Sequence, residues 1–344
     1  MTGAYAYYRL PHQRCYTTVE GSVREYDSCK RLNGQKGFVI APFETSAEYP
    51  IVVITPESVS ERELPATEET AYEPMDAEPV TEAYHDDFQL FHEQLRSGRF
   101  RKIVLARCSD TAMPQGVRPQ DLFFQACALY PRLFIALVST PQSGIWLTAT
   151  PEILLEGGGH WRTIALAGTM KLTPQQLQGE GETVSWSTKN IQEQRLVASY
   201  IADCLERYAA DVSEEGPRTV RAANLVHLRS DFTFVLPDHG HLGDLLSQLH
   251  PTPAVCGLPK NETLQFIVDN EHTPRRYYSG FMGMLDPEGD THLYVSLRCM
   301  HIEGTVSHLY AGGGLLPDSV ETQEWQETEA KLETMRRCIA TRRT

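Results

Sequence analysis

The sequence lacks the long apolar run that a membrane-spanning helix needs. Stretches such as Phe134–Val138 are among its longest apolar runs and fall far short of the roughly 20 residues that cross a bilayer. The N-terminus has no basic stretch followed by an apolar core, so we expect no secretory signal. The eight cysteines form no CxxC pair and no Cys/His zinc spacing. These absences favour reduced thiols in the cytoplasm over a membrane protein or a disulfide-bonded secreted domain.

Two nucleotide-binding signatures are also missing, because the chain contains neither GxGxxG nor a P-loop. Positive charge is in deficit: 31 Lys and Arg stand against 45 Asp and Glu, a formal net charge of −14. This balance argues against nucleic acids and anionic membranes as partners. An anionic substrate would require cations placed close to it, because the overall field of the protein repels it.

The length of 344 residues indicates one large domain or two fused halves. Residues 1–55 contain strand-like stretches at 37–42 and 51–55. Residues 56–87 are acidic and rich in Pro, Thr and Glu without periodicity, and we interpret them as a surface connection. Asp86 and Asp87 then open a helix that ends at Gly98.

After Gly98, short apolar runs alternate with helix-like segments in no regular βαβ order. This irregular alternation predicts an α+β fold rather than a doubly wound α/β fold. The expected helices cover 119–129, 185–208 and 321–340, and the expected strands include 103–106, 133–138, 145–148, 163–166, 232–236 and 293–297.

Two of these helices place carboxylates where apolar residues belong. Glu193 falls within an apolar stripe that continues at Leu196 and Val197. Glu324 and Glu327 line the edge of the stripe on the C-terminal helix, followed by Lys331. A carboxylate that faces a core must be paired or must bind a metal, and oxygen ligands from two helices would suit Mg²⁺. Ordinary ion pairs, Glu327 with Lys331 and Glu193 with Lys189, explain the same pattern and are the simpler interpretation from spacing alone.

Nine motifs, in order over residues 100–337, resemble the chorismate-utilising family, which comprises isochorismate, salicylate, anthranilate and aminodeoxychorismate synthases. The motifs are RKIVLAR (101–107), ATPEILL (149–155), ALAGT (165–169), KNIQE (189–193), NLVHL (224–228), LHPTPAVCGLPK (249–260), RRYYSGFMG (275–283), VSLR (295–298) and YAGGGLLPDSVETQEWQETEAKL (310–332). The resemblance implies a single large α+β unit of two packed antiparallel sheets, with outer helices and a cleft active site. Residues 1–98 would be a divergent part of this fold and 99–344 its chorismate-binding catalytic region.

The resemblance implies that Glu193 and Glu327 hold Mg²⁺, with Glu324 assisting. In this sequence Asn190 replaces an acidic residue and Gln194 replaces a histidine that relatives carry in the KNIQE motif, so we expect weaker Mg²⁺ binding.

The implied substrate, chorismate, carries two carboxylates. Mg²⁺ would bind the ring carboxylate. An Arg fork and backbone amides of glycines are suited to the enolpyruvyl carboxylate. The substrate-binding residues implied by the family are Ala167, Gly168, Thr169, His227 (over the ring), Ala254, Tyr278, Arg298, Gly312, Gly313, Gly314 and Lys331.

The family match also implies an acid and a base. Lys102 stands at the position of a lysine base, and partial burial would lower its pKa so that it takes a proton from water attacking ring C2. Glu152 stands at the position of the acid that protonates the leaving C4 hydroxyl, which requires a raised pKa. Without the match, a solvated lysine at a strand end and a surface carboxylate would be the simpler interpretations.

Two alanines select a branch of the family. Ala167 replaces the nucleophilic lysine of aminodeoxychorismate synthases, so water is the expected nucleophile and no glutaminase subunit is needed. Ala254 replaces a threonine of pyruvate-eliminating members. We therefore expect a monomeric enzyme that isomerises chorismate to isochorismate, for menaquinone rather than a catechol siderophore. A salicylate synthase and a non-catalytic chorismate-binding protein remain the alternatives.

Overall fold

The computed structural model describes residues 3–66, 72, 78–171, 185–222 and 225–339. Its strands are β1 (Ala4–Arg9), β2 (Cys15–Tyr26), β3 (Gly37–Ala41), β4 (Ile51–Glu63), β5 (Lys102–Ala112), β6 (Phe134–Thr140), β7 (Gly144–Thr150), β8 (Ile153–Gly157), β9 (Trp161–Lys171), β10 (Ala210–Ala222), β11 (Leu225–Val235), β12 (Gly257–Leu258), β13 (Phe281–Leu285), β14 (Thr291–Val295), β15 (Cys299–Glu303) and β16 (Val306–Leu315). Its helices are α1 (Glu82–Arg96), α2 (Pro119–Leu129), α4 (Thr188–Leu205), α5 (Leu242–Leu249), α6 (Lys260–Asn270) and α7 (Glu321–Ile339).

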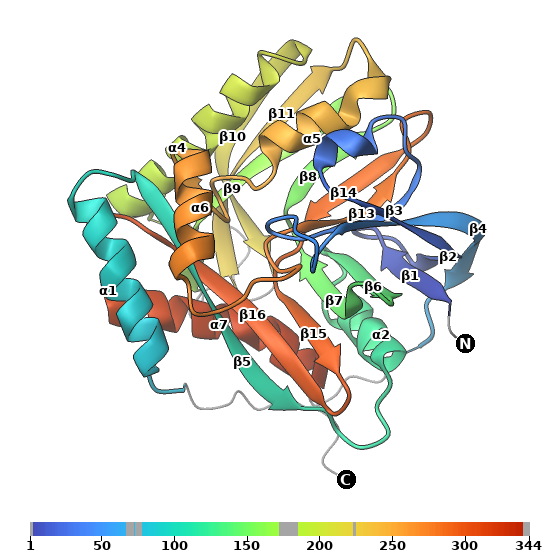
Figure 1. Ribbon diagram of the computed structural model, residues 1–344, viewed down its shortest axis with the longest axis horizontal. Coiled ribbons are helices and arrows are strands. Elements are labelled where there is room, and N and C mark those ends of the chain that lie inside the picture. The colour runs from blue at the N-terminus through green and yellow to red at the C-terminus, as the bar shows by residue number, and fades with distance from the viewer. Residues whose placement is uncertain (1–2, 67–71, 73–77, 172–184, 223–224, 340–344) are drawn as a thin grey trace.

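The strands hydrogen-bond in one continuous antiparallel order, β10-β11-β9-β8-β14-β13-β3-β4-β2-β1-β6-β7-β15-β16-β5-β12. This sheet folds back on itself, because Phe134 of β6 stacks on Tyr294 of β14 with ring centroids 4.2 Å apart. Aliphatic and aromatic residues of both halves fill the space between them. The expected α+β class is confirmed, and the two packed layers are halves of one sheet joined through β4, β2 and β1 (Figure 1).

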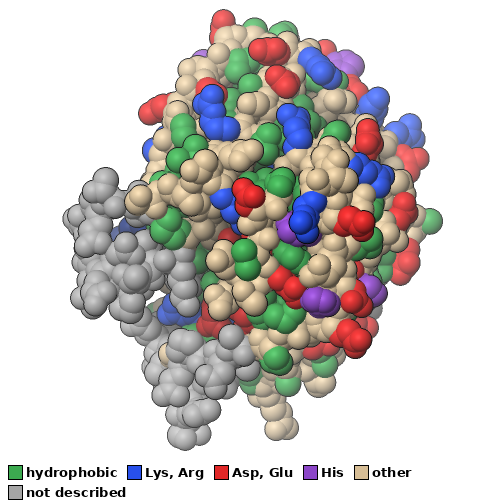
Figure 2. All heavy atoms as spheres, turned by 90° about the vertical axis from the view of Figure 1, so that its left-hand side faces the viewer, with side chains coloured by type: hydrophobic (Ala, Val, Ile, Leu, Met, Phe, Trp, Pro, Cys, Tyr) green, Lys and Arg blue, Asp and Glu red, His purple; other side chains and the backbone are tan. Residues whose placement is uncertain are grey.

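Helices cover the outer faces of the two halves. The apolar side of α4 packs over β9 and β11, and α5 packs against α4 and the short 3-10 helix at Cys29–Leu32. On the other half, α2 and α7 pack over β6, β7 and β16. No helix within the described ranges is both long and apolar enough to cross a membrane. Figure 2 shows acidic side chains interspersed with basic ones over the face seen from the side of α1. At one edge of the molecule α4 packs on β9, and α7 packs on both β16 and β9. Both halves of the sheet can therefore contribute to a site there.

Two expectations for the N-terminal region were wrong. Residues 56–63 are not a loose connection, because β4 continues to Glu63 and pairs with β2 along its whole length. The following helix begins at Glu82 rather than at Asp86, with the Thr81 hydroxyl capping the Tyr84 amide at 3.3 Å. Its end near Gly98 is as predicted. The part of the acidic segment at 67–71 and 73–77, and residue 340 of the predicted last helix, lie outside the described residues.

A buried ion-pair network fixes α7 on β5. Arg107 donates to the Thr328 hydroxyl at 2.7 Å and pairs with Glu329. Its guanidinium lies 3.7 Å from the centroid of the Trp325 ring. Glu329 also accepts from Arg336 at 2.8 Å. Because α7 carries Glu324, Glu327 and Lys331, this network determines where those side chains lie.

We predict that Arg107→Leu destabilises the protein by about 3–5 kcal/mol, since removing one partner of a buried ion pair leaves the other charge undercompensated. Urea denaturation followed by circular dichroism measures the change. Arg118→Leu is the matched control, because the Arg118–Asp121 pair is exposed and should contribute little. Equal stability of the two variants would contradict the structural role of Arg107.

Candidate active site

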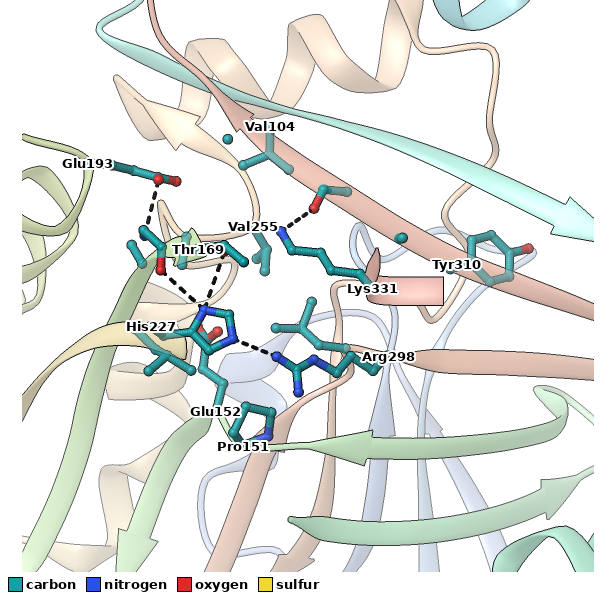
Figure 3. A pocket seen from close by; sticks show the side chains of 18 of the residues that line it. Val104, Pro151, Glu152, Thr169, Glu193, His227, Val255, Arg298, Tyr310 and Lys331 are labelled. Atoms are coloured by element: carbon teal, nitrogen blue, oxygen red, sulfur yellow. Dashed lines mark hydrogen bonds between the residues drawn. The ribbon is translucent and has the colours of Figure 1, made fainter. Parts of the chain in front are cut away.

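One pocket gathers most of the residues that the sequence motifs single out. It lies where β9, β11 and β16 approach α4 and α7 (Figure 3). Its lining is Val104, Pro151, Glu152, Leu166, Ala167, Gly168, Thr169, Glu193, His227, Ala254, Val255, Tyr278, Leu297, Arg298, Tyr310, Ala311, Gly312, Gly314 and Lys331. The other predicted site residues, Lys102, Gly313, Glu324 and Glu327, lie just behind this lining rather than in it.

A buried ion pair joins the two halves of the site. Lys102 of β5 is 0% exposed, and its Nζ lies 2.8 Å from Oε1 of Glu193 on α4. The other Glu193 oxygen accepts from the Gly168 amide at 3.1 Å. Burial raises the pKa of Glu193, but the charge and hydrogen bond of Lys102 outweigh burial, and the pKa is lowered overall. Beyond the ion pair, the Lys102 ammonium has no hydrogen-bond partner among the described residues, so it retains donor capacity at the pocket wall.

The absence of a side chain at Gly314 makes this ion pair possible. A Cβ atom at that position would lie 2.1 Å from Glu193 Oε1 and 3.0 Å from Lys102 Cε. Any larger residue would therefore push the two charged groups apart.

The remaining predicted metal ligands are also paired with lysines. Glu324 pairs with Lys189, and Glu327 accepts from Lys331 at 2.8 Å. The alternative pair of Glu193 with Lys189 is thus wrong, whereas the Glu327–Lys331 pair is present. Burial first, and the charge of Glu327 second, raise the pKa of Glu324.

The chemistry of these three carboxylates fits a hard divalent cation. They supply oxygen ligands only, and the repulsion between Glu324 and Glu327 is the kind that a cation relieves. Their oxygens do not all lie within 4.8 Å of one another among the described residues. Binding would therefore require Lys189 or Lys331 to release its carboxylate.

Glu152 is a buried carboxyl on the opposite wall. It follows β7 and is 2% exposed, so it is not the surface carboxylate of the simpler interpretation. Burial raises its pKa to about 7, although Lys102, Lys331 and Arg298 act in the other direction. Among the described residues, the one hydrogen bond of the Glu152 carboxyl is a long one, 3.5 Å from the Thr252 hydroxyl. The raised pKa agrees with the direction expected for a proton donor.

Arg298 and His227 form a fixed pair. Arg298 Nη2 lies 2.6 Å from His227 Nε2, and since a guanidinium can only donate, this imidazole nitrogen accepts. His227 Nδ1 then carries the proton and donates to the Gly168 carbonyl at 3.2 Å. Burial and the charge of Arg298 lower the pKa of His227 well below its usual value. Burial also lowers the pKa of Arg298 to about 10, which leaves it cationic at neutral pH.

His227 thus lines the pocket and orients Arg298. Its expected place over the substrate ring stays a prediction. Arg298 itself has a left-handed backbone, φ 48°, a conformation that costs about 1–3 kcal/mol for a residue other than glycine. Such strain is typical of side chains held for a function.

The glycine strand presents amides on alternate sides. The Ala106 amide donates to Glu271 at 2.7 Å rather than to β16. Ala106 and Gly312, which stand opposite each other in the ladder, therefore form a non-hydrogen-bonded pair, and the Gly312 amide points away from β5. Gly312 and Gly314 therefore direct their amides toward the edge beyond β15, and the Gly312 carbonyl accepts from Lys331 at 2.7 Å. Gly313 faces β5, so the expectation that all three amides line the site was wrong. Tyr278 lies against Gly312, where a Cβ would be 2.7 Å from its hydroxyl.

The sequence argument gave no structural role to three residues that support the site. Gln194 accepts from the Ala167 amide at 2.9 Å and donates to the Ala165 carbonyl at 3.0 Å, so it fixes α4 on β9. Asn190 packs against Gly168: a Cβ atom at position 168 would lie 3.2 Å from the Cβ of Asn190. Thr252 contacts Glu152, two residues before Ala254. Only the position of these residues inside matched motifs could have indicated them, because their partners are distant in sequence.

The fold is shared with solved structures. The isochorismate synthase DhbC of Bacillus anthracis superposes with a TM-score of 0.84 at 24% identity, covering 98% of this chain and 97% of that one. MenF, the menaquinone-specific isochorismate synthase of Escherichia coli, gives a TM-score of 0.82 at 23% identity and covers 98% and 89%.

Curated relatives share more sequence over a shorter region. EntC of Escherichia coli, an isochorismate synthase, is 29% identical over 238 residues, 68% of this chain and 61% of that protein. A salicylate biosynthesis isochorismate synthase of Pseudomonas aeruginosa is 33% identical over 252 residues, 72% and 52%. The chain thus matches between half and three fifths of the length of these relatives. Residues 52–340 match the family model of chorismate binding enzymes, and the chain therefore belongs to the family of chorismate-binding enzymes.

Proposed function

We propose that the protein is an isochorismate synthase that converts chorismate to isochorismate with Mg²⁺. The observation that carries this proposal is that a buried lysine, Lys102, and a separate buried carboxyl, Glu152, both lie at one pocket. A protein that only binds its ligand needs neither group in a desolvated position. The names of the relatives, isochorismate synthases from several bacteria, support the same reaction.

The chemistry follows from groups in the pocket lining and directly behind it. Lys102, once released from Glu193 and neutral, removes a proton from the water that attacks ring C2. The ring double bonds shift, and the C4–O bond breaks. Glu152, protonated below a pKa of about 7, gives its proton to the departing hydroxyl, which leaves as water. Ala167 provides no amine to compete with water as nucleophile.

The charges of the pocket explain how a dianion enters a protein of net charge −14. Arg298 is cationic and held by His227, and the Gly312 and Gly314 amides face the same space, which suits one carboxylate. Mg²⁺ held by Glu193, Glu324 and Glu327 would neutralise the other carboxylate. We further propose that the enzyme acts as a cytoplasmic monomer and that its product is used for menaquinone. All eight cysteines are free thiols, as a reducing compartment requires.

Removal of the metal gives the first test of this function. Excess chelator should abolish turnover and added Mg²⁺ should restore it, as measured by isochorismate formation. Glu327→Gln should raise the Mg²⁺ concentration needed for half-maximal activity, because one anionic ligand is lost. Glu57→Gln, a change of an exposed carboxylate on β4, is the control. Full activity in excess chelator would refute the Mg²⁺ assignment.

The acid and the base give a second test. Lys102→Ala and Glu152→Gln should each lower kcat by about 10²–10⁴-fold, as for positioned proton transfer, with a smaller effect on KM. Because Glu152 must be protonated, kcat should fall as the pH rises through about 7. This limb should disappear from the residual activity of Glu152→Gln, since an amide does not titrate here. Near wild-type kcat in Lys102→Ala would rule out the lysine as the base.

Ala254 gives a third test, which separates the proposed reaction from salicylate synthesis. A methyl group cannot hydrogen-bond the enolpyruvyl arm, so the wild-type protein should release isochorismate with little pyruvate. Ala254→Thr adds a hydroxyl and a branched wall that can hold the arm over C2 in a reactive geometry. This variant should release more pyruvate and salicylate, read by a lactate dehydrogenase assay and by fluorescence. Stoichiometric pyruvate from the wild-type protein would make salicylate synthase the correct function.

A further inference from the structure

A second group of metal-ligating side chains lies outside the pocket, near the hairpin end of β15 and β16. Cys108 and Asp110 stand two residues apart on β5 and therefore share one face of the sheet. His308 of β16 pairs in register with Asp110. Figure 1 shows this end of β5 beside the β15–β16 hairpin. Asp110 is exposed, whereas Cys108 and His308 are half-buried, Cys108 at the edge of the apolar core.

The ligand atoms of these three residues are already close together. Cys108 Sγ, an Asp110 carboxylate oxygen and a His308 ring nitrogen all lie within 4.8 Å of one another. His308 Nδ1 is 2.7 Å from Asp110 Oδ1, and Cys108 Sγ is 3.8 Å from the same oxygen. Two ligands of a tetrahedral zinc ion stand about 3.3–3.8 Å apart, given their bond lengths to the metal. Small side-chain rotations would complete the set.

We propose that Cys108, Asp110 and His308 form a binding site for a divalent transition metal of the zinc type, separate from the carboxylates of the pocket. A thiolate, an imidazole and a carboxylate are the ligand classes that zinc accepts, whereas Mg²⁺ and Ca²⁺ require oxygen ligands. Binding forms a metal–sulfur bond and releases the thiol proton to solvent. Water is the expected fourth ligand.

A neighbouring group of residues offers a competing ligand set. His301, Glu303 and His308 also bring ligand atoms within 4.8 Å of one another, and His308 Nε2 lies 3.6 Å from Glu303. However, Arg276 lies 3.1 Å from His301 Nδ1. Its guanidinium donates to that nitrogen, and its charge lowers the pKa of His301, which burial lowers first, to about 4. The charge of Arg276 acts on Cys108 as well, so charge alone does not separate the two ligand sets. The hydrogen bond that occupies His301 Nδ1 favours the Cys108 side of His308.

The bound ion would link β5 to β16. These are the strands that carry Lys102 and the glycine amides farther along, so metal occupancy would stiffen the frame of the pocket without touching the substrate. Metal binding at Cys108, Asp110 and His308 is independent of the reaction proposed for the pocket.

The test uses the 344-residue protein after a chelator has removed bound metal. The protein is then titrated with Zn²⁺ in saturating Mg²⁺, and a chromophoric chelator that competes for Zn²⁺ reports the affinity. Loss of a residue that only hydrogen-bonds a metal ligand typically weakens metal binding roughly 10- to 100-fold. Because they remove a ligand itself, Cys108→Ser, Asp110→Asn and His308→Gln should each weaken Zn²⁺ binding by at least this factor. Cys15→Ser and His241→Gln are matched controls, because these residues lie elsewhere and should leave Zn²⁺ affinity unchanged.

Cobalt substitution identifies the sulfur ligand. The Co²⁺-loaded wild-type protein and Cys15→Ser should show a thiolate-to-cobalt absorption band in the near ultraviolet, and Cys108→Ser should lack it. Thermal unfolding without metal checks that each variant is folded. The proposal is overturned if the wild-type protein shows no stoichiometric Zn²⁺ binding, or if Cys108→Ser binds Zn²⁺ as tightly as the wild type. It is also overturned if His301→Gln and Glu303→Gln abolish binding while Cys108→Ser does not.

Discussion

The ion pair between Lys102 and Glu193 is the contact on which the site depends. It joins β5 to α4 across the pocket wall, with both groups withdrawn from water. Two charges in this position are tolerated only with close geometry and further hydrogen bonds, and the Gly168 amide supplies one of these. Gly314 supplies the space. The ion pair and its surroundings therefore bring together four sequence motifs that are far apart in the chain. They also explain why Glu193 requires a glycine at position 314.

Other cations of the pocket that the structure describes also contact specific partners. Lys331 contacts Glu327 and the Gly312 carbonyl, Lys189 contacts Glu324, and Arg298 contacts the neutral His227. Histidine is the weakest of these partners because it carries no charge. A lysine that contacts substrate or metal must therefore first exchange its carboxylate partner.

Sequence patterns predicted the parts of the molecule whose signal is local. The helix at 119–129 and the C-terminal helix from 321 were correct because their apolar spacing is regular, and the motif residues did gather at one pocket. The long strand β4 was missed beyond 55 because its exposed half is polar and lacks an apolar face. The partners of Lys189 and His227 were out of reach, since Glu324 and Arg298 lie far away in the chain. The alternation of Gly312, Gly313 and Gly314 depends on strand register, which a run of three glycines does not reveal.

Two carboxyls at one pocket have pKa values shifted in opposite directions, and the difference lies in their partners rather than in their burial. Both are almost fully withdrawn from solvent. Glu193 has a lysine at 2.8 Å and a backbone amide at 3.1 Å, so its pKa is lowered. Glu152 has a single hydroxyl at 3.5 Å and only more distant cations, so burial prevails and its pKa rises to about 7. Pairs of this kind separate the proton donor from the anionic ligand in many active sites. In the proposed mechanism this separation suits Glu152 to act as the acid. It leaves Glu193 ionised, so that Glu193 could exchange Lys102 for a cation and release the lysine to act as a base.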